Sequence, residues 1–125
     1  MSKIAIKIGS NILTDKKGRL NQKRIHAIAS DVAAICKDGH EVVIVSSGAV
    51  AAGMKKLALK EKPKDIRLKQ AAAAVGQPSL MWAYEKGFGD FGKKVAQVLL
   101  TREDFSERVR YLNSKNTLIT LLSYG

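Results

Sequence analysis

The sequence predicts an α/β layer architecture with a mostly parallel sheet. Short apolar or alternating segments at 3–8, 41–45 and 94–100 are typical of strands, and helical patterns stand between them. Strands that alternate with helices indicate β-α-β units, in which the strands run parallel. The chain has 125 residues, 46% of them apolar, which suits one domain with its own core.

A first β-α-β unit accounts for residues 3–45. Lysine and isoleucine alternate around an alanine at 3–8, which predicts a short strand with one apolar face. A polar loop over 14–21 ends at Asn21, a good helix N-cap, and Gly39 supplies the stop. The β-branched run at 41–45 is typical of a strand covered on both faces. Apolar residues recur at helical spacing between loop and stop: Ile25, Ile28, Ala29, Val32, Ala33 and Ile35.

The second half predicts more helix and one more strand. We expect helices over 49–59 and 65–86, the latter deformed at 76–78 because Pro78 has no backbone N–H. A strand over 94–100 and a polar loop over 101–106 follow. A last helix over 107–122 offers Val109, Leu112, Leu118, Leu121 and Leu122 for packing. Three strands are fewer than a typical sheet holds, so we expect the sheet to be incomplete in this chain.

The charge predicts an anionic partner. Lys and Arg number 22 against 11 Asp and Glu, a net charge of +11. Nucleic acid, phosphorylated or carboxylated small molecules, or an acidic part of the protein outside this chain would each fit. The basic run 55–69 has no interleaved aromatic residue, so it argues only weakly for nucleic acid, which we do not expect as a partner. Without an apolar run of about 18 residues or a signal peptide, we expect a cytoplasmic protein with no membrane contact.

Two familiar motifs do not predict a site. The glycines of 87-GFGDFG-92 match a dinucleotide fingerprint, but they follow a helix and precede a strand, so we expect a helix stop and a turn there. No P-loop sequence is present. Cys36, His26 and His40 stand apart at spacings that suit no metal, so we expect no metal ligands among them.

The segment 45-VSSGAVAAG-53 has the order strand, turn, helix that an anion site requires. Backbone N–H groups of the first helical turn are free there, and the helix dipole favours negative charge. Gly48 and Ala49 permit close approach, and Ser46 and Ser47 offer hydroxyl donors. Alternatively, the small residues only let the helix pack closely on the sheet. The pattern does not decide between the two interpretations.

A second donor cluster is predicted at 7-KIGSN-11. Lys7 lies at the end of the first strand, and Gly9 and Ser10 form a turn at the same carboxyl edge of the sheet. Ligands of parallel sheets bind at that edge. A lysine there can stabilise the charge that develops during phosphoryl transfer.

Five blocks, in one order along nearly the whole chain, resemble the amino acid kinase family: 7-KIGSN-11, 42-VVIVSSGAVAAG-53, 71-AAAAVGQPSLM-81, 96-AQVLLTREDF-105 and 110-RYLNSKNT-117. The resemblance implies a three-layer αβα sandwich with a mainly parallel sheet. It also implies ATP-dependent phosphorylation of the L-glutamate γ-carboxylate, the first step of proline biosynthesis, with ATP and Mg²⁺. By the same resemblance, Lys7 is catalytic and contacts phosphate, Gly9 and Ser10 bind phosphate, and Ser47, Gly48 and Ala49 bind glutamate.

The resemblance also has departures. Residues 1–125 correspond to the amino-terminal, glutamate-binding part of such a kinase domain, and the nucleotide-binding half is absent. Asn11 follows Ser10 where the family has a second hydroxyl residue. An unpaired sheet edge leads us to expect a homo-oligomer. Two other functions remain open: a catalytically silent module for substrate or subunit binding, and a basic nucleic-acid-binding protein.

Overall fold

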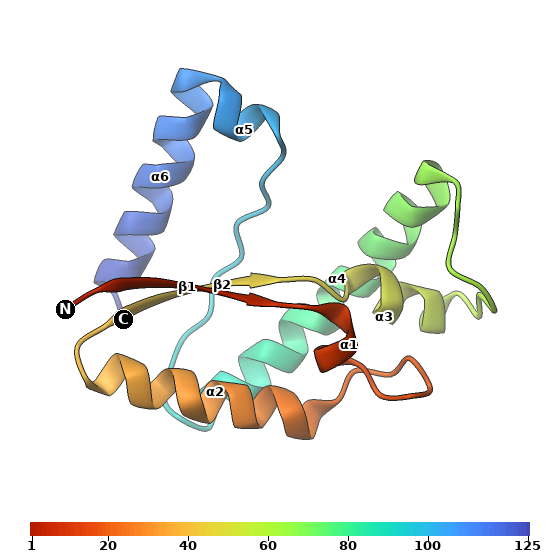
Figure 1. Ribbon diagram of the computed structural model, residues 1–125, viewed down its shortest axis with the longest axis horizontal. Helices are drawn as coiled ribbons and strands as arrows, with labels where there is room; N and C mark the ends of the chain where they lie inside the picture. Colours follow the sequence, from red (N-terminus) through yellow and green to blue (C-terminus); the bar gives the residue numbers. More distant parts are fainter.

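The computed structural model describes all residues from Met1 to Gly125 and has a mixed α/β fold (Figure 1). The chain forms one two-stranded parallel sheet and six helices. The elements along the chain are β1 (Lys3–Ile8), α1 (Ser10–Leu13), α2 (Gln22–Lys37), β2 (Glu41–Ser46), α3 (Ala49–Lys56), α4 (Ile66–Gly89), α5 (Glu103–Ser106) and α6 (Arg108–Ser123). No helix is both long and apolar enough to cross a membrane.

The predicted β-α-β unit is confirmed. β1 and β2 pair in parallel, with Lys3 opposite Glu41 and Ile8 opposite Ser46, and the Lys3 ammonium forms an ion pair with Glu41. α2 begins after Asn21, whose side chain accepts the Arg24 backbone N–H at 3.1 Å. Because side chains alternate along a strand, the isoleucines of β1 face one side of the sheet and its lysines face the other.

The core lies between the isoleucine face of the sheet, α2 and α4. Ile8 at the end of β1 packs with the buried face of α2 and with one stripe of α4. The stripe recurs at helical spacing, as expected for a helix that buries one side. The buried members are Ile8, Leu13, Ile25, Ala29, Val32, Leu80, Ala83, Tyr84 and Phe88.

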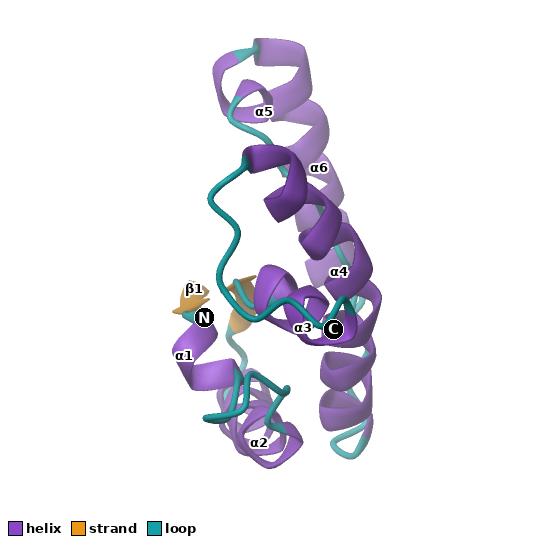
Figure 2. Cartoon of the chain, turned by 90° about the vertical axis from the view of Figure 1, so that its right-hand side faces the viewer, coloured by secondary structure: helices purple, strands orange, loops and turns teal.

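The helices α3 and α4 cross in backbone contact at two glycines. A Cβ atom at Gly53 would lie 1.6 Å from the Ala72 carbonyl oxygen, and one at Gly76 would lie 1.9 Å from the Ala49 carbonyl oxygen. Only glycine permits this approach. The small residues thus do allow close packing of α3, but the predicted partner, the sheet, is wrong, because the helix packs on α4. Figure 2 shows α3 lying against α4 in a view along the sheet.

α4 is longer and more regular than predicted. It begins after Asp65, whose carboxylate accepts the Arg67 N–H at 3.0 Å, and runs without interruption through Pro78 to Gly89. Pro78 is exposed, as is Ala74, so water can satisfy the Ala74 carbonyl that lost its donor. Pro78 therefore does not interrupt the helix, and the glycine-rich stop and turn over 87–92 is confirmed.

The predicted strand over 94–100 is wrong. Its residues form no backbone hydrogen bonds and lie outside the sheet, because a strand exists only beside a partner and neither edge of this sheet meets them. α6 forms as predicted but buries none of its residues, and it contacts mainly α5. The short α5 was expected to be loop. At the start of α5, the Thr101 backbone N–H donates to the Asp104 carboxylate at 2.5 Å, and this hydrogen bond lowers the pKa of Asp104.

We expect Gly53→Ala to destabilise the chain by about 2 kcal/mol or more, because the new methyl group must separate α3 from α4. Urea unfolding followed by circular dichroism measures this. Gly89→Ala is the matched control, since nothing lies within 4 Å of its added Cβ; within a helix, it should raise stability by up to about 1 kcal/mol. Equal effects of the two substitutions would contradict the close contact.

Candidate functional site

The two predicted donor clusters lie side by side at the carboxyl edge of the sheet. Ile8 and Ser46 are register partners at the ends of their strands. The turn at Gly9 and Ser10 continues from the first, and the turn at 47–48 continues from the second (Figure 1). Residues far apart in the sequence therefore meet at one edge, where parallel sheets bind ligands.

Ser47 fastens the two turns together. Its backbone N–H and its hydroxyl both donate to the Ile8 carbonyl oxygen, each at 3.1 Å. The Ser46 hydroxyl donates to the Ser47 carbonyl oxygen at 3.0 Å. Both hydroxyl hydrogens therefore have acceptors within the protein, and the expectation that they serve as donors to a ligand stays a prediction. A hydroxyl has a single hydrogen, so only its oxygen lone pairs remain available.

The free donors are backbone N–H groups at the start of α3. The first hydrogen bond of that helix runs from Ala52 N–H to the Gly48 carbonyl at 3.0 Å, and the N–H groups of residues 49–51 have no acceptor in the protein. Gly48 precedes them with φ +107°, a left-handed conformation that glycine adopts without strain. Together with the helix dipole, these groups favour a carboxylate or phosphate at this position.

Lys7 lies on the open face of the sheet, one residue before the end of β1. It pairs in register with Val45, its side chain is exposed, and no acidic group forms an ion pair with it. Val45 is 53% exposed, so no helix covers this face at the carboxyl edge. An ammonium here is free to approach an anion bound at the edge.

Tyr84, which the sequence did not point to, supports the turn after β2 from the core side. It is buried on α4, and its hydroxyl lies 2.7 Å from the Ser46 Oγ. Either of the two hydroxyls can donate in this pair. Burial raises the pKa of the Tyr84 phenol above 10.0, and the Ser46 hydrogen bond opposes the rise. The only available signal was its spacing from Leu80 and Phe88, which is typical of core.

No metal centre accompanies these groups. No cluster of three or more His, Cys, Asp or Glu side chains could hold a metal ion. The groups described at the candidate site are cationic and backbone donors.

The chain is similar to known proteins along its whole length. The model of the amino acid kinase family matches residues 2–125. A protein of Geobacter metallireducens named glutamate 5-kinase is 51% identical over 125 residues, which are 100% of this chain and 34% of that protein. A protein of the same name from Thermus thermophilus is 54% identical over 123 residues, 98% of this chain and 33% of that protein. The chain thus spans about a third of the length of these relatives.

We expect Tyr84→Phe to reduce the loss of stability at alkaline pH. Because the Tyr84 pKa is raised in the folded state, the native chain holds the phenolic proton more tightly than the unfolded chain does. The contribution of Tyr84 to the free energy of unfolding is therefore complete below about pH 10 and is lost as the pH rises through the folded-state pKa. The variant should lose about 0.5–1.5 kcal/mol at neutral pH through its missing hydrogen bond.

Urea unfolding across the alkaline range measures this dependence. Tyr124→Phe, at an exposed position, is the control and should leave the pH dependence unchanged. A Tyr84→Phe chain that loses stability as steeply as the parent would show that Tyr84 does not carry the effect.

Proposed function

Since this chain belongs to the amino acid kinase family, we propose that the protein transfers the γ-phosphoryl group of ATP to the γ-carboxylate of L-glutamate. The product would be L-glutamyl 5-phosphate, the first intermediate of proline biosynthesis. Residues 1–125 would form the amino-terminal, glutamate-binding part of the domain. The names of relatives about 50% identical along the whole chain support this choice of substrate.

The observation that carries the proposal is the meeting of two anion-attracting groups at one sheet edge. The unpaired N–H groups of residues 49–51 suit a carboxylate of glutamate, and the small residues Gly48 and Ala49 leave room for the amino acid. Lys7, in register beside the same turn, suits the phosphoryl group. Gly9 and Ser10 begin the neighbouring turn and would contribute backbone donors to phosphate.

The reaction would be an in-line displacement. A γ-carboxylate oxygen of glutamate forms a bond to the γ-phosphorus, and the bond between that phosphorus and the β,γ-bridging oxygen breaks as ADP leaves with the electron pair. The carboxylate is already ionised at neutral pH, so no base is required. The Lys7 ammonium would counter the charge that develops on the phosphoryl oxygens.

The proposed domain is larger than the part described here. A complete three-layer αβα sandwich would cover the open face of the sheet and supply the nucleotide pocket and the ligands of Mg²⁺. Self-association is a further part of the proposal, supported by the unpaired sheet edges and by exposed apolar side chains on α6 such as Val109 and Ile119.

Titration of the 125-residue chain with L-glutamate should move the backbone amide NMR signals of residues 7–10 and 46–53, because both turns face the ligand. L-glutamine is the matched control ligand; it lacks the γ-carboxylate charge and should bind more weakly. Saturable shifts confined to other regions, or equal affinity for the two amino acids, would contradict the assignment of the glutamate site.

Lys7→Met should lower turnover by about a hundredfold or more, as expected when a donor to developing charge is removed. The test uses a chimera in which residues 1–125 replace the matching segment of the Geobacter metallireducens relative, with acyl phosphate trapped as the hydroxamate. Lys3→Met, on the same face of β1 but at its other end, is the control and should change turnover only a few-fold.

Near-normal turnover in Lys7→Met would remove Lys7 from the mechanism. A folded chimera that binds glutamate but yields no hydroxamate would instead favour the catalytically silent binding module.

A further inference from the structure

Trp82 on α4 presents an aromatic surface that the proposed kinase site does not use. It is the sole tryptophan of the chain, and it is 61% exposed although the next residue, Ala83, is buried. The Lys86 ammonium lies 5.2 Å from the ring centroid, a cation–π distance. One ammonium covers only one face of the ring, so a flat apolar face remains for contact with another molecule.

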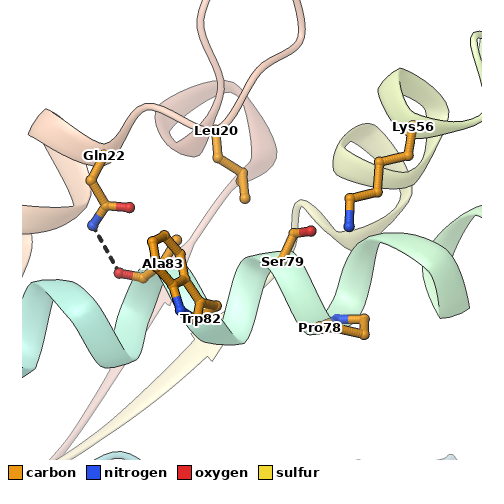
Figure 3. A pocket seen from close by; sticks show the side chains of 7 residues that line it. All are labelled: Leu20, Gln22, Lys56, Pro78, Ser79, Trp82 and Ala83. Atoms are coloured by element: carbon orange, nitrogen blue, oxygen red, sulfur yellow. Dashed lines mark hydrogen bonds between the residues drawn. The ribbon is translucent and has the colours of Figure 1, made fainter.

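An open pocket of about 510 Å³ lies beside this ring, between the start of α2, the end of α3 and the middle of α4 (Figure 3). Several polar groups of the pocket have no partner in the protein. The Lys56 ammonium forms no ion pair and the Ser79 hydroxyl forms no hydrogen bond. The Gln22 amide N–H donates to the Ala83 carbonyl at 2.9 Å, and the Gln22 amide oxygen accepts no hydrogen bond. No acidic residue contributes to the lining, which consists of Leu20, Gln22, Lys56, Pro78, Ser79, Trp82 and Ala83.

Basic segments adjoin the pocket on two sides. On the α3 side, residues 55–69 hold seven lysines and arginines against two acidic residues, and none of the seven forms an ion pair. On the other side, Lys23 and Arg24 follow Gln22 and are exposed. Lys56 is the member of the run that lines the pocket, and Lys23 and Arg24 directly follow the lining residue Gln22, so basic residues continue along the chain from both sides of the lining.

We propose that this surface binds single-stranded nucleic acid, with a base stacked on Trp82 and adjacent phosphates on Lys56 and Lys86. Sequence-tolerant binders of single strands combine a basic path with an aromatic platform. The sequence argued only weakly for nucleic acid because no aromatic residue interrupts the run 55–69. The fold places Trp82, from a different part of the chain, in the lining of the same pocket as Lys56. An acidic polypeptide would match the charge but would have no use for the flat ring.

The test titrates the 125-residue chain with an oligouridylate of about 12 nucleotides, within the site sizes of known single-strand binders. Emission from Trp82 should be quenched by stacking, and no other tryptophan contributes to the signal. Anisotropy of a labelled oligonucleotide gives the affinity, which should fall about tenfold between roughly 50 and 200 mM salt for two or three phosphate contacts.

Variants separate the local site from the overall charge. Trp82→Leu should weaken binding by about tenfold or more, and Lys56→Gln by several-fold. Lys115→Gln removes the same charge from the exposed surface of α6 and should stay within about twofold of the parent chain. Circular dichroism checks that each variant is folded. If Trp82→Leu does not fold, the comparison of Lys56→Gln with Lys115→Gln tests whether binding is local to the pocket.

Several results would overturn the proposal: no binding or no quenching at low salt, equal effects of the Lys56 and Lys115 substitutions, or equal affinity for poly-glutamate. AMP that binds as tightly as the oligonucleotide would replace a strand-binding surface with a mononucleotide pocket. None of these results bears on glutamate binding at the sheet edge, so this proposal and the kinase proposal fail independently.

Discussion

The backbones of α3 and α4 touch at Gly53 and Gly76, and the geometry of both proposed surfaces depends on this contact. It fixes the start of α3, where the unpaired N–H groups of residues 49–51 lie at the sheet edge. It also brings Lys56, at the end of α3, over the same helix that carries Trp82. Since carbonyl oxygens occupy the positions of the missing Cβ atoms, no larger residue can substitute without separating the helices.

The polar side chains at the carboxyl edge connect the two turns to each other and to the core. Ser47 joins the turn to Ile8 through two hydrogen bonds, and Tyr84 supports Ser46 from the core. These bonds fix the direction of the first turn of α3 before any ligand binds. A site arranged in advance loses little conformational entropy on binding, which suits a small, flexible ligand such as an amino acid.

Positive charge gathers around the same end of the molecule. Lys7 lies on the open sheet face, and the run 55–69 forms the end of α3, the connector and the start of α4 (Figure 1). Unpaired cations raise the local concentration of anions and the rate at which they arrive. One charge distribution can thus serve a phosphorylated substrate at the sheet edge and a polyanion at the pocket beside Trp82.

The sequence by itself determined the β-α-β unit, the last helix, the glycine-rich stop of α4 and the meeting of the two turns at the carboxyl edge. These features depend on local periodicity, on capping residues such as Asn21 and on the rule that parallel strands end together. Only the tertiary structure decided the rest. The run 94–100 has the composition of a strand but pairs with no edge of the sheet. Gly76 of α4 contacts the Ala49 backbone of α3. The Ser47 hydroxyl donates to the Ile8 carbonyl oxygen. Each of these features depends on a contact with a residue far away in the sequence. Local sequence patterns do not specify such contacts.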